Sequence, residues 1–329
     1  MDEQEKTASL PCFTSKVLAV VGATGTGKSL LADALAHTLD GEVVSADSMQ
    51  IYQGMDIGTA KMPPAERTVP YHCLDMVTLD VSFTAALYQR AARSAIETIC
   101  DRGKLPVVCG GTGLYVRAAL DDFVFDKHYA DTTPLALRTQ LTAQAEEMGS
   151  EAFHALLAEC DPQSAALIHP HNVRRVVRAF ELLEEGTTYA EQQAGFSTYS
   201  SFYPTYYLGI EVAPAVLYEV INRRVDTLIE KGLLEEVRAL VDAGYEHTSG
   251  FSQAIGYKEL CSVLRGTEEL FTAVERIKQA TRRYAKRQRS WFKRDGRINW
   301  IDATDLHRAV LEGTLDHSSF LHTLCARVA

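Results

Sequence analysis

A glycine-rich run near the start of the chain has the residue types and spacing of a phosphate-binding loop. Residues 22–29 read GATGTGKS and match G-x-x-x-x-G-K-[ST] at every fixed position, between an apolar run and an amphipathic one. In such a loop, backbone N–H groups and a helix N-terminus face an anion, a lysine neutralises its charge, and a hydroxyl reaches Mg²⁺. We predict a diphosphate or nucleotide site formed by Gly22, Ala23, Thr24, Gly25, Thr26, Gly27, Lys28 and Ser29, with Ser29 as a ligand of Mg²⁺. The alternative is a glycine-rich turn that holds no ligand.

Two further polar residues follow predicted strands that should end beside this loop. The run 41–46 delivers Asp47, and the apolar run 105–109 leads into GGTG, which contains Thr112. In open parallel sheets, ligands bind beyond the carboxyl ends of the strands, so both side chains should face one crevice. Asp47 could be a general base, a Mg²⁺ ligand or a helix cap. An NTPase usually carries an acidic residue at the end of the second strand to hold Mg²⁺, but this chain has glycine there. The run GGTG would instead offer backbone N–H donors and the Thr112 hydroxyl to a leaving or bridging oxygen, unless it is only a tight strand-to-helix turn.

Additional polar groups could reach the same crevice. The segment 51–62 follows directly from Asp47 and carries Asp56 and Lys61, although a plain surface loop is the alternative. A helix opened by a proline at 214 contains two adjacent arginines, 223 and 224, one of which could turn toward the phosphates.

The second informative region is a strongly basic run near the end of the chain. The formal net charge of the whole chain is −10, yet residues 278–297 contain nine basic side chains and one acidic one. At helical spacing, one stripe is basic (Arg282, Lys286, Arg289, Lys293), and its neighbour is aromatic and polar (Tyr284, Gln288, Trp291). Cationic side chains can bind phosphates, and neighbouring aromatic rings can stack on bases. This combination suits a folded or single-stranded nucleic acid. The alternative is a salt-bridged helix that covers an acidic core and buries its aromatic residues.

Two shorter segments add candidate polar contacts. Residues 172–183 predict a helix with a buried valine-rich face and three arginines, 174, 175 and 178, largely on the other side. This face suits a phosphate backbone, or it is merely solvated. Residues 251–260 predict a loop that enters a helix and offers hydrogen-bonding and stacking groups.

Composition and pattern predict a two-domain α/β protein. The chain is 46% hydrophobic and 23% charged, as is usual for globular proteins. We expect a P-loop NTPase-like parallel sheet core with a helical C-terminal region, formed by residues 1–124 and 204–329. The segment 125–203 has no clear strand and predicts an inserted all-helical domain. Beyond Trp300 we expect only a helical tail.

The sequence also favours a cytoplasmic protein without a membrane anchor. No apolar run approaches the length of a bilayer span, and the first 16 residues are polar and lack a signal-peptide pattern. The seven cysteines are odd in number and show no C-x-x-C spacing, which argues against a disulfide framework or a zinc site and favours buried free thiols.

Taken together, these motifs resemble the tRNA dimethylallyltransferase family, also called tRNA isopentenyltransferases. The resemblance covers residues 17 to about 300 and implies transfer of the dimethylallyl group of dimethylallyl diphosphate to N6 of the adenosine 3′-adjacent to the anticodon. It further implies Mg²⁺ and an inserted domain that grips the tRNA anticodon stem-loop; we expect a monomer. The segments that carry it are GATGTGKS from Gly22, SADSMQIYQGMDIGTAKM from Ser45, VVCGGTGLY from Val107, NVRRVVRAFELLEEG from Asn172, QAIGYKEL from Gln253 and TRRYAKRQRSWFKR from Thr281.

The resemblance also implies a role for individual residues. Asp47 would be the general base, Thr112 a partner of the bridging oxygen of the diphosphate, and Arg224 a further holder of the diphosphate. The implied tRNA contacts are Asp47, Ser48, Met49, Gln50, Arg174, Arg175, Val176, Val177, Arg178, Gln253, Ala254, Ile255, Gly256, Tyr257, Lys258, Lys286, Arg287, Gln288, Arg289, Ser290, Trp291, Phe292 and Lys293.

This chain departs mildly from the family pattern. Ala23 stands where members often have proline, and Ser29 where they often have threonine. No zinc-finger-like extension follows Trp300, which favours a bacterial-type enzyme. Three other functions compete: a P-loop small-molecule kinase, a non-catalytic RNA-binding nucleotide sensor, and an isopentenyltransferase that acts on free adenylates.

Overall fold

The chain divides into two compact units in the computed structural model, which describes residues 16–122, 125, 135–196 and 198–328. Unit 1 consists of Met1–Leu120 and Tyr203–Ala329, and unit 2 is Asp121–Phe202. The predicted domain boundary at residue 124 and most of the polar segment at the start of the chain lie outside the described residues.

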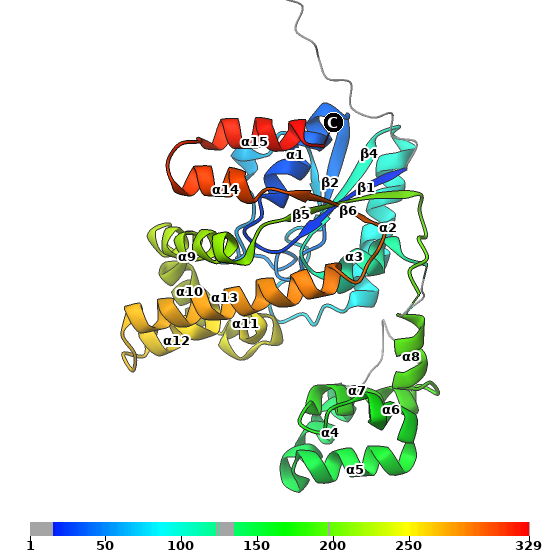
Figure 1. Ribbon diagram of the computed structural model, residues 1–329. Coiled ribbons are helices and arrows are strands. Elements are labelled where there is room, and N and C mark those ends of the chain that lie inside the picture. Colours follow the sequence, from blue (N-terminus) through cyan, green and yellow to red (C-terminus); the bar gives the residue numbers. More distant parts are fainter. Residues whose placement is uncertain (1–15, 123–124, 126–134, 197, 329) are drawn as a thin grey trace, which may run out of the picture. The chain divides into compact units, whose positions relative to one another are not determined.

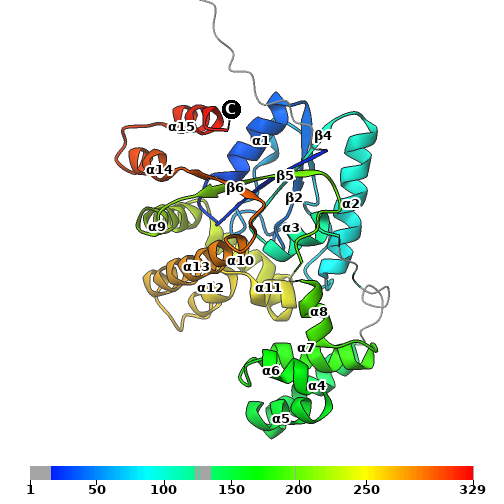
Figure 2. The same cartoon turned by 45° about the vertical axis from the view of Figure 1, so that its right-hand side comes forward.

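Unit 1 is built on a parallel sheet (Figure 1 and Figure 2). Its strands are β1 (Val17–Gly22), β2 (Gly41–Ser45), β3 (Tyr71–His72), β4 (Leu105–Gly110), β5 (Thr205–Glu211) and β6 (Ile298–Asp302). They form one six-stranded sheet in the order β3-β2-β4-β1-β5-β6, with every neighbouring pair parallel. The predicted α/β class with a parallel sheet is therefore confirmed. Because β1 lies between β4 and β5, the loop after β1 opens at the point where the strand order reverses.

The sequence of β1 explains its central position. Its residues VLAVVG form a continuous apolar run and all are buried, as expected for a strand covered on both faces. Helix α1 (Lys28–Thr38) packs against β2 and β4. Helices α2 (Ala85–Asp101) and α3 (Gly113–Leu120) cover the opposite face, since right-handed crossovers that run in opposite directions along a sheet lie on opposite sides. A short 3₁₀ turn, η1 (Pro64–Glu66), lies in the long connection between β2 and β3.

The second half of unit 1 is mainly helical. Its elements are α9 (Pro214–Glu230), α10 (Leu233–Asp242), η3 (Tyr245–His247), α11 (Ser249–Gln253), α12 (Tyr257–Leu264), α13 (Leu270–Phe292), α14 (Thr304–Leu311) and α15 (His317–Ala326). The basic run thus belongs to α13, which packs between α9 and α12 and touches β1.

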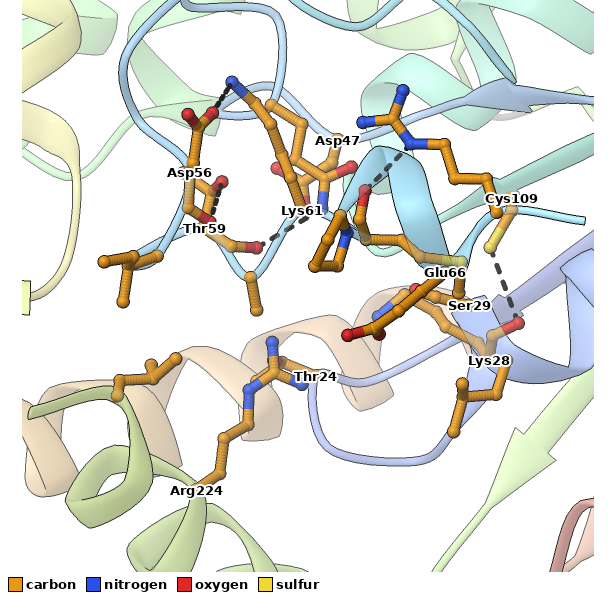
Figure 3. A pocket seen from close by; sticks show the side chains of 18 of the residues that line it. Thr24, Lys28, Ser29, Asp47, Asp56, Thr59, Lys61, Glu66, Cys109 and Arg224 are labelled. Carbon is orange, nitrogen blue, oxygen red and sulfur yellow. Dashed lines mark hydrogen bonds and ion pairs between the residues drawn. The ribbon is translucent and has the colours of Figure 1, made fainter. Parts of the chain in front are cut away.

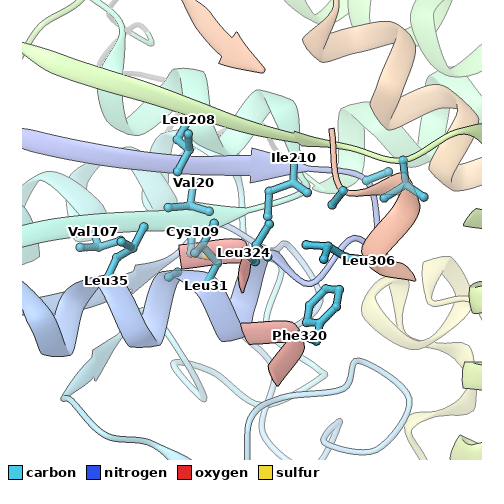
Figure 4. Close-up of a cluster of buried hydrophobic side chains, with 14 of the residues drawn as sticks. Val20, Leu31, Leu35, Val107, Cys109, Leu208, Ile210, Leu306, Phe320 and Leu324 are labelled. Carbon is cyan, nitrogen blue, oxygen red and sulfur yellow. The ribbon is translucent and has the colours of Figure 1, made fainter. Parts of the chain in front are cut away.

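One prediction for the end of the chain is wrong. We expected only helix beyond Trp300, but Ile298–Asp302 forms the edge strand β6 beside β5. An edge strand has one neighbour and a solvated side, so its sequence INWID lacks the long apolar run of a central strand. The helices that follow are not a loose tail, because Leu306, Phe320 and Leu324 are buried against α1 and the sheet (Figure 4).

Unit 2 is helical in its described residues, apart from one isolated bridge between Asp121 and Ser201. Its helices are α4 (Leu135–Met148), α5 (Ser150–Cys160), α6 (Pro162–Leu167), α7 (Val173–Glu184) and α8 (Tyr189–Gly195). Phe153, Leu157, Val176 and Leu182 form the centre of its hydrophobic core.

Two expectations from composition can be compared with the structure. The six described cysteines are all free thiols, of which Cys73, Cys109 and Cys261 are buried while Cys160 is exposed. Within the described ranges, no helix combines the length and the apolarity that crossing a bilayer requires.

Candidate active site

A pocket of about 570 Å³ opens beside the glycine-rich loop, at the carboxyl ends of the central strands. Its walls come from the loop after β1, the end of β2, the end of β4, the segment 56–67 and helix α9. In Figure 3, Arg224 points from α9 toward the glycine-rich loop, across from Asp56 and Lys61. The polar and charged side chains in its lining include Thr24, Lys28, Ser29, Asp47, Gln50, Asp56, Thr59, Lys61, Arg67, Cys109, Arg224 and Lys231.

The backbone of the glycine-rich loop presents the start of α1 to this pocket. Gly25 and Gly27 both have φ of 85°, a left-handed conformation that other residues adopt only with strain. Helix α1 begins directly afterwards at Lys28 and has no acidic residue in its first turn. The unpaired N–H groups and the helix dipole therefore give this end of the pocket a positive potential suited to an anion.

Part of the loop is used for internal support. The Thr26 hydroxyl donates to the Ala23 carbonyl at 2.9 Å, and the Thr24 N–H donates to the Gln288 side chain at 2.8 Å. His307, from α14, lies 3.2 Å from the Thr26 carbonyl. We expected every residue of the loop to serve the phosphate, but the Thr24 amide is already occupied by α13, and Gly22, Ala23 and Thr26 are not in the pocket lining. Their small size and internal bonds shape the loop instead.

Lys28, Arg224 and Asp47 make a charged triad in the pocket. Burial lowers the pKa of the Lys28 ammonium. The negative charges of Cys109 and Asp47 would raise that pKa and so oppose the shift, whereas the positive charge of Arg224 lowers it further. Burial likewise lowers the pKa of Arg224, again opposed by Asp47. An incoming diphosphate would relieve the repulsion between the two cations, which makes the arrangement suited to a polyanion. The adjacent Arg223 instead donates to the Leu311 carbonyl and to Glu219.

Asp47 and Thr112 lie at the ends of adjacent strands, and hydrogen bonds join those ends. The Ser48 N–H donates to the Thr112 hydroxyl at 3.1 Å, and the Thr112 N–H donates to the Ala46 carbonyl at 3.2 Å. The Asp47 carboxylate accepts from the Met49 N–H at 2.9 Å. Asp47 lines the pocket and Thr112 does not. The backbone amide of Thr112 is thus used within the sheet, which corrects the expectation that GGTG offers it to a phosphate.

Two charged side chains, the buried Lys61 and the half-buried Glu236, hold the segment that follows Asp47 in place. Lys61 Nζ is buried and binds Asp56 at 2.8 Å and Asp75 at 2.5 Å. From α10, the half-buried Glu236 accepts from the backbone N–H groups of residues 56, 57 and 58, at 2.9, 2.7 and 3.1 Å. Gln50 donates to the Thr59 carbonyl at 3.2 Å. This segment is therefore an ordered wall of the pocket rather than a plain surface loop.

The pocket has the donors that Mg²⁺ requires when it arrives with a phosphate ester. Among the described residues, no three His, Cys, Asp or Glu side chains are grouped so that they could hold a metal ion. Magnesium at phosphate sites, however, takes one or two protein oxygens and completes its shell with substrate oxygens and water. The Ser29 hydroxyl and the Asp47 carboxylate both line the pocket, so the residues present fit such an ion.

In unit 2, the predicted contact helix offers fewer groups than its sequence suggested. Arg174 and Arg175 are exposed on α7. Val176 and Val177 lie in the core of unit 2, so their side chains cannot reach a partner. Arg178 is largely buried and pairs with Glu181 at 2.9 Å and with Glu185 at 3.1 Å. The helix was predicted, but sequence alone did not show that two acidic residues on the same helix hold its third arginine.

The segment 253–258, also predicted to contact tRNA, likewise contains both exposed and buried residues. Gln253 and Lys258 are exposed, Ile255 is half-buried, and Ala254, Gly256 and Tyr257 are buried. The Tyr257 hydroxyl donates to Glu236 at 2.6 Å. Tyr257 therefore packs inside unit 1 and supports the wall of the pocket, and its ring is not available to stack on a base.

Helix α13 has a paired and an unpaired basic face. Arg289 donates to Glu211 at 2.6 Å, Lys293 pairs with the same carboxylate, and Arg282 donates to Asn222 at 2.5 Å. The predicted basic stripe is therefore largely directed at the protein itself. Ser290 and Trp291 are exposed, Phe292 is buried, and Gln288 is buried against two loops. On the exposed side of α13 and the turn after it, Arg283, Lys286, Arg287 and Arg294 have no ion pair with any described residue.

Three supporting residues were missed by sequence reasoning. Glu236 and His307 carry no local motif, and Gln288 was assigned to tRNA contact because the family resemblance implies that contact for the run 286–293. Each bonds a residue far away in the sequence: Glu236 lies 178 positions from Gly58, His307 lies 281 positions from Thr26, and Gln288 lies 264 positions from Thr24. No spacing rule covers separations of this size.

Comparisons with known proteins point to the same family as the sequence motifs. Residues 50–295 match the family model described as IPP transferase. A tRNA dimethylallyltransferase of Geobacillus thermodenitrificans is 46% identical over 295 residues, covering 89% of this chain and 92% of the relative. The enzyme of that name from Bacillus subtilis is 42% identical over 289 residues, covering 88% and 91%.

Two solved structures extend the likeness to the fold. The full-length tRNA isopentenylpyrophosphate transferase of Bacillus halodurans superposes with a TM-score of 0.66 at 38% identity and covers 95% of this chain and 97% of its own. A eukaryotic dimethylallyltransferase described as acting on tRNA gives a TM-score of 0.75 at 29% identity. The match covers 94% of this chain and 80% of that protein's chain. The resemblance seen in the motifs is confirmed, and the chain belongs to the IPP transferase family, whose curated members are named tRNA dimethylallyltransferase.

Proposed function

We propose that this chain is a tRNA dimethylallyltransferase that acts in the cytoplasm. It transfers the dimethylallyl group of dimethylallyl diphosphate to N6 of the adenosine 3′-adjacent to the anticodon. In this reaction the C–O bond to the diphosphate breaks, an N6–C bond forms, N6 loses a proton, and diphosphate is released. The observation that carries the proposal is the convergence of Lys28, Arg224 and Asp47 on one pocket beside a phosphate-binding loop. It provides a polyanion site and a proton acceptor together.

The cationic end of the pocket serves the leaving group. An adenine amine is a poor nucleophile because its lone pair is delocalised into the ring, so departure of the diphosphate must be assisted. Lys28, Arg224 and the N-terminus of α1 neutralise the charge that develops on it, in a partly desolvated site where such interactions are strong. Bound Mg²⁺ would supply further charge neutralisation, held by Ser29 together with diphosphate oxygens.

Asp47 accepts the proton from N6. A carboxylate is a weak base, so it takes the proton only as attack makes the nitrogen acidic. The hydrogen bond from the Met49 N–H orients the carboxylate. We assign Thr112 to the bridging oxygen of the diphosphate from the family resemblance. Its side chain lies outside the pocket lining, so its hydroxyl must turn from the Ser48 hydroxyl, to which it donates at a long 3.3 Å, to reach the substrate.

Exposed cations provide the contacts to the tRNA anticodon stem-loop. The cations are Arg174 and Arg175 in unit 2, and Lys258 with the unpaired face of α13 in unit 1; the exposed Gln253 adds a neutral amide. Contacts of this kind position a phosphate backbone without reading sequence. Because the reacting base must leave its stack to enter a pocket, Trp291, which is 38% exposed, is suited to support the splayed loop.

The test is transfer of radiolabelled dimethylallyl groups from the diphosphate, with Mg²⁺, to unmodified tRNA or to free AMP, with ATP hydrolysis measured in parallel. Label in tRNA alone is expected. Label only in AMP would identify an enzyme of free adenylates, and ATP turnover without transfer would identify a kinase.

The Asp47→Asn variant tests the assigned base. We expect turnover to fall by about 10²- to 10⁴-fold, the usual contribution of a general base, with tRNA binding retained. Equal loss of turnover and of tRNA binding would contradict the assignment.

A further inference from the structure

Helix α13 reaches both loops at the diphosphate end of the pocket through one side chain. The Thr24 N–H of the glycine-rich loop donates to Gln288 Oε1 at 2.8 Å, and Gln288 Nε2 donates to the Gly111 carbonyl at 2.8 Å. Gln288 is only 5% exposed. Its amide therefore bridges the loop after β1 and the loop after β4.

We propose that Gln288 is a positioning residue for the diphosphate, because its amide sets the distance between the two loops that flank that group. The identity of the ligand rests on the proposed function, but the bridge itself does not. Gln288 acts through the loops and is not assigned a contact with substrate.

Only an amide of this length can make the bridge. Thr24 presents a donor and Gly111 presents an acceptor, so the side chain between them must accept at one atom and donate at the other. Glutamate accepts at both oxygens, and methionine does neither. Leaving the buried Gly111 carbonyl and the part-buried Thr24 N–H without partners is unfavourable, so the loops would move to find other partners.

The glycines of GGTG support the same interpretation. A Cβ placed on Gly111 would lie 2.3 Å from Gln288 Nε2, and one on Gly113 would lie 2.1 Å from the Trp291 ring. Both clashes are with α13. The two glycines are therefore required where α13 lies against the loop, and the Tyr284 side chain, which interacts with Thr112 and Gln288, completes this contact.

The experiment compares Gln288→Met with Gln89→Met. Gln89 is also a buried glutamine that donates to a backbone carbonyl, Ala118, but it lies on α2 outside the pocket lining. Affinity for inorganic diphosphate with Mg²⁺ is measured by calorimetry, together with the KM for dimethylallyl diphosphate, kcat and tRNA affinity.

We expect Gln288→Met to weaken diphosphate binding by about 10- to 100-fold, as the loss of two hydrogen bonds, one buried and one part-buried, predicts. The KM should rise by a similar factor, with a smaller change in kcat and unchanged tRNA affinity. Gln89→Met should leave diphosphate affinity unchanged. Gln288→Glu, which keeps the Thr24 bond but adds a negative charge, should bind diphosphate even more weakly.

Equal diphosphate affinity in Gln288→Met and Gln89→Met would overturn the proposal. If Gln288→Met does not fold, Gln288→Asn replaces it, since asparagine keeps the amide but is one methylene too short; wild-type diphosphate affinity in that variant has the same meaning. The two proposals can fail separately. If the wild-type chain binds diphosphate more tightly than Gln288→Met but transfers no dimethylallyl group to tRNA, the proposed function is refuted and this inference is left intact.

Discussion

The guanidinium of Arg289 donates to the Glu211 carboxylate at 2.6 Å, and the same carboxylate also holds Lys293. Burial alone would raise the pKa of Glu211, but Lys293 and Arg289 together hold it below its usual value. Two cations of α13 are thus committed to the end of β5. The basic face that remains for a polyanion is the one that carries Arg283, Lys286 and Arg287.

This division predicts unequal effects on RNA binding. Replacing Arg283, Lys286 and Arg287 by alanine should reduce the slope of log affinity against log salt by about 2, since each phosphate contact on single-stranded nucleic acid contributes about 0.7. The matched double variant Arg289→Ala plus Lys293→Ala should change the slope by less than about 0.7. Filter binding of tRNA over a salt series measures both, and a reduction of about 1.4 in the double variant, the value for two phosphate contacts, would show that the pairing with Glu211 does not persist in the complex.

A second prediction concerns the contact between α13 and the loop after β4. Gly113→Ala places a methyl group against the Trp291 ring, which must rotate away, and should cost about 1–3 kcal/mol. Trp291→Ala in the same chain should recover part of that loss, giving a coupling of at least about 0.5 kcal/mol. Urea unfolding of the two single variants and the double variant measures it; strict additivity would mean that the two residues do not meet.

The wall of the pocket depends on Glu236. Glu236→Gln replaces one acceptor oxygen by a donor that faces backbone N–H groups, so we expect a loss of about 1.5–3 kcal/mol in unfolding free energy. It should also speed proteolytic cleavage within residues 51–62. Tyr257→Phe removes the phenol bond to Glu236 at 2.6 Å and the contact of the hydroxyl with the Gly58 backbone, but keeps Glu236 itself, and serves as the milder control. If Glu236→Gln left cleavage of this segment unchanged, its order would have another source.

Stability should fall in mild acid because of His307. Burial lowers the pKa of His307 from 6.5, and its hydrogen bond to the Thr26 carbonyl only partly opposes that shift. Below pH 6.5 the unfolded chain therefore binds a proton that the native chain does not, and stability declines as the pH falls toward the native pKa. The slope from this residue is at most about 1.4 kcal/mol per pH unit. Urea unfolding at pH 7.5 and 5.5 measures the decline, and His307→Gln should reduce it; an identical decline in that variant would assign it to other groups.

Local patterns in the sequence determined the chemistry of this protein. The glycine-rich loop must follow a buried strand and open a helix, so its eight residues predicted both the phosphate site and the sheet around it. The family resemblance rests on such runs of neighbouring residues, each long enough to be specific. Even the expectation that Asp47 faces the same crevice follows from a local rule, since parallel strands end at a common edge.

The tertiary structure alone decided which side chains remain available. Arg289 and Lys286 are equally basic in sequence, but only Arg289 meets Glu211, which lies 78 positions earlier. Gln288 looked like part of a nucleic-acid surface, yet a helix rotates successive residues by about 100°, and this rotation turns its amide into the core between two loops. A periodic pattern fixes how residues are spaced around a helix. Which of them are paired depends on distant partners that only folding brings together.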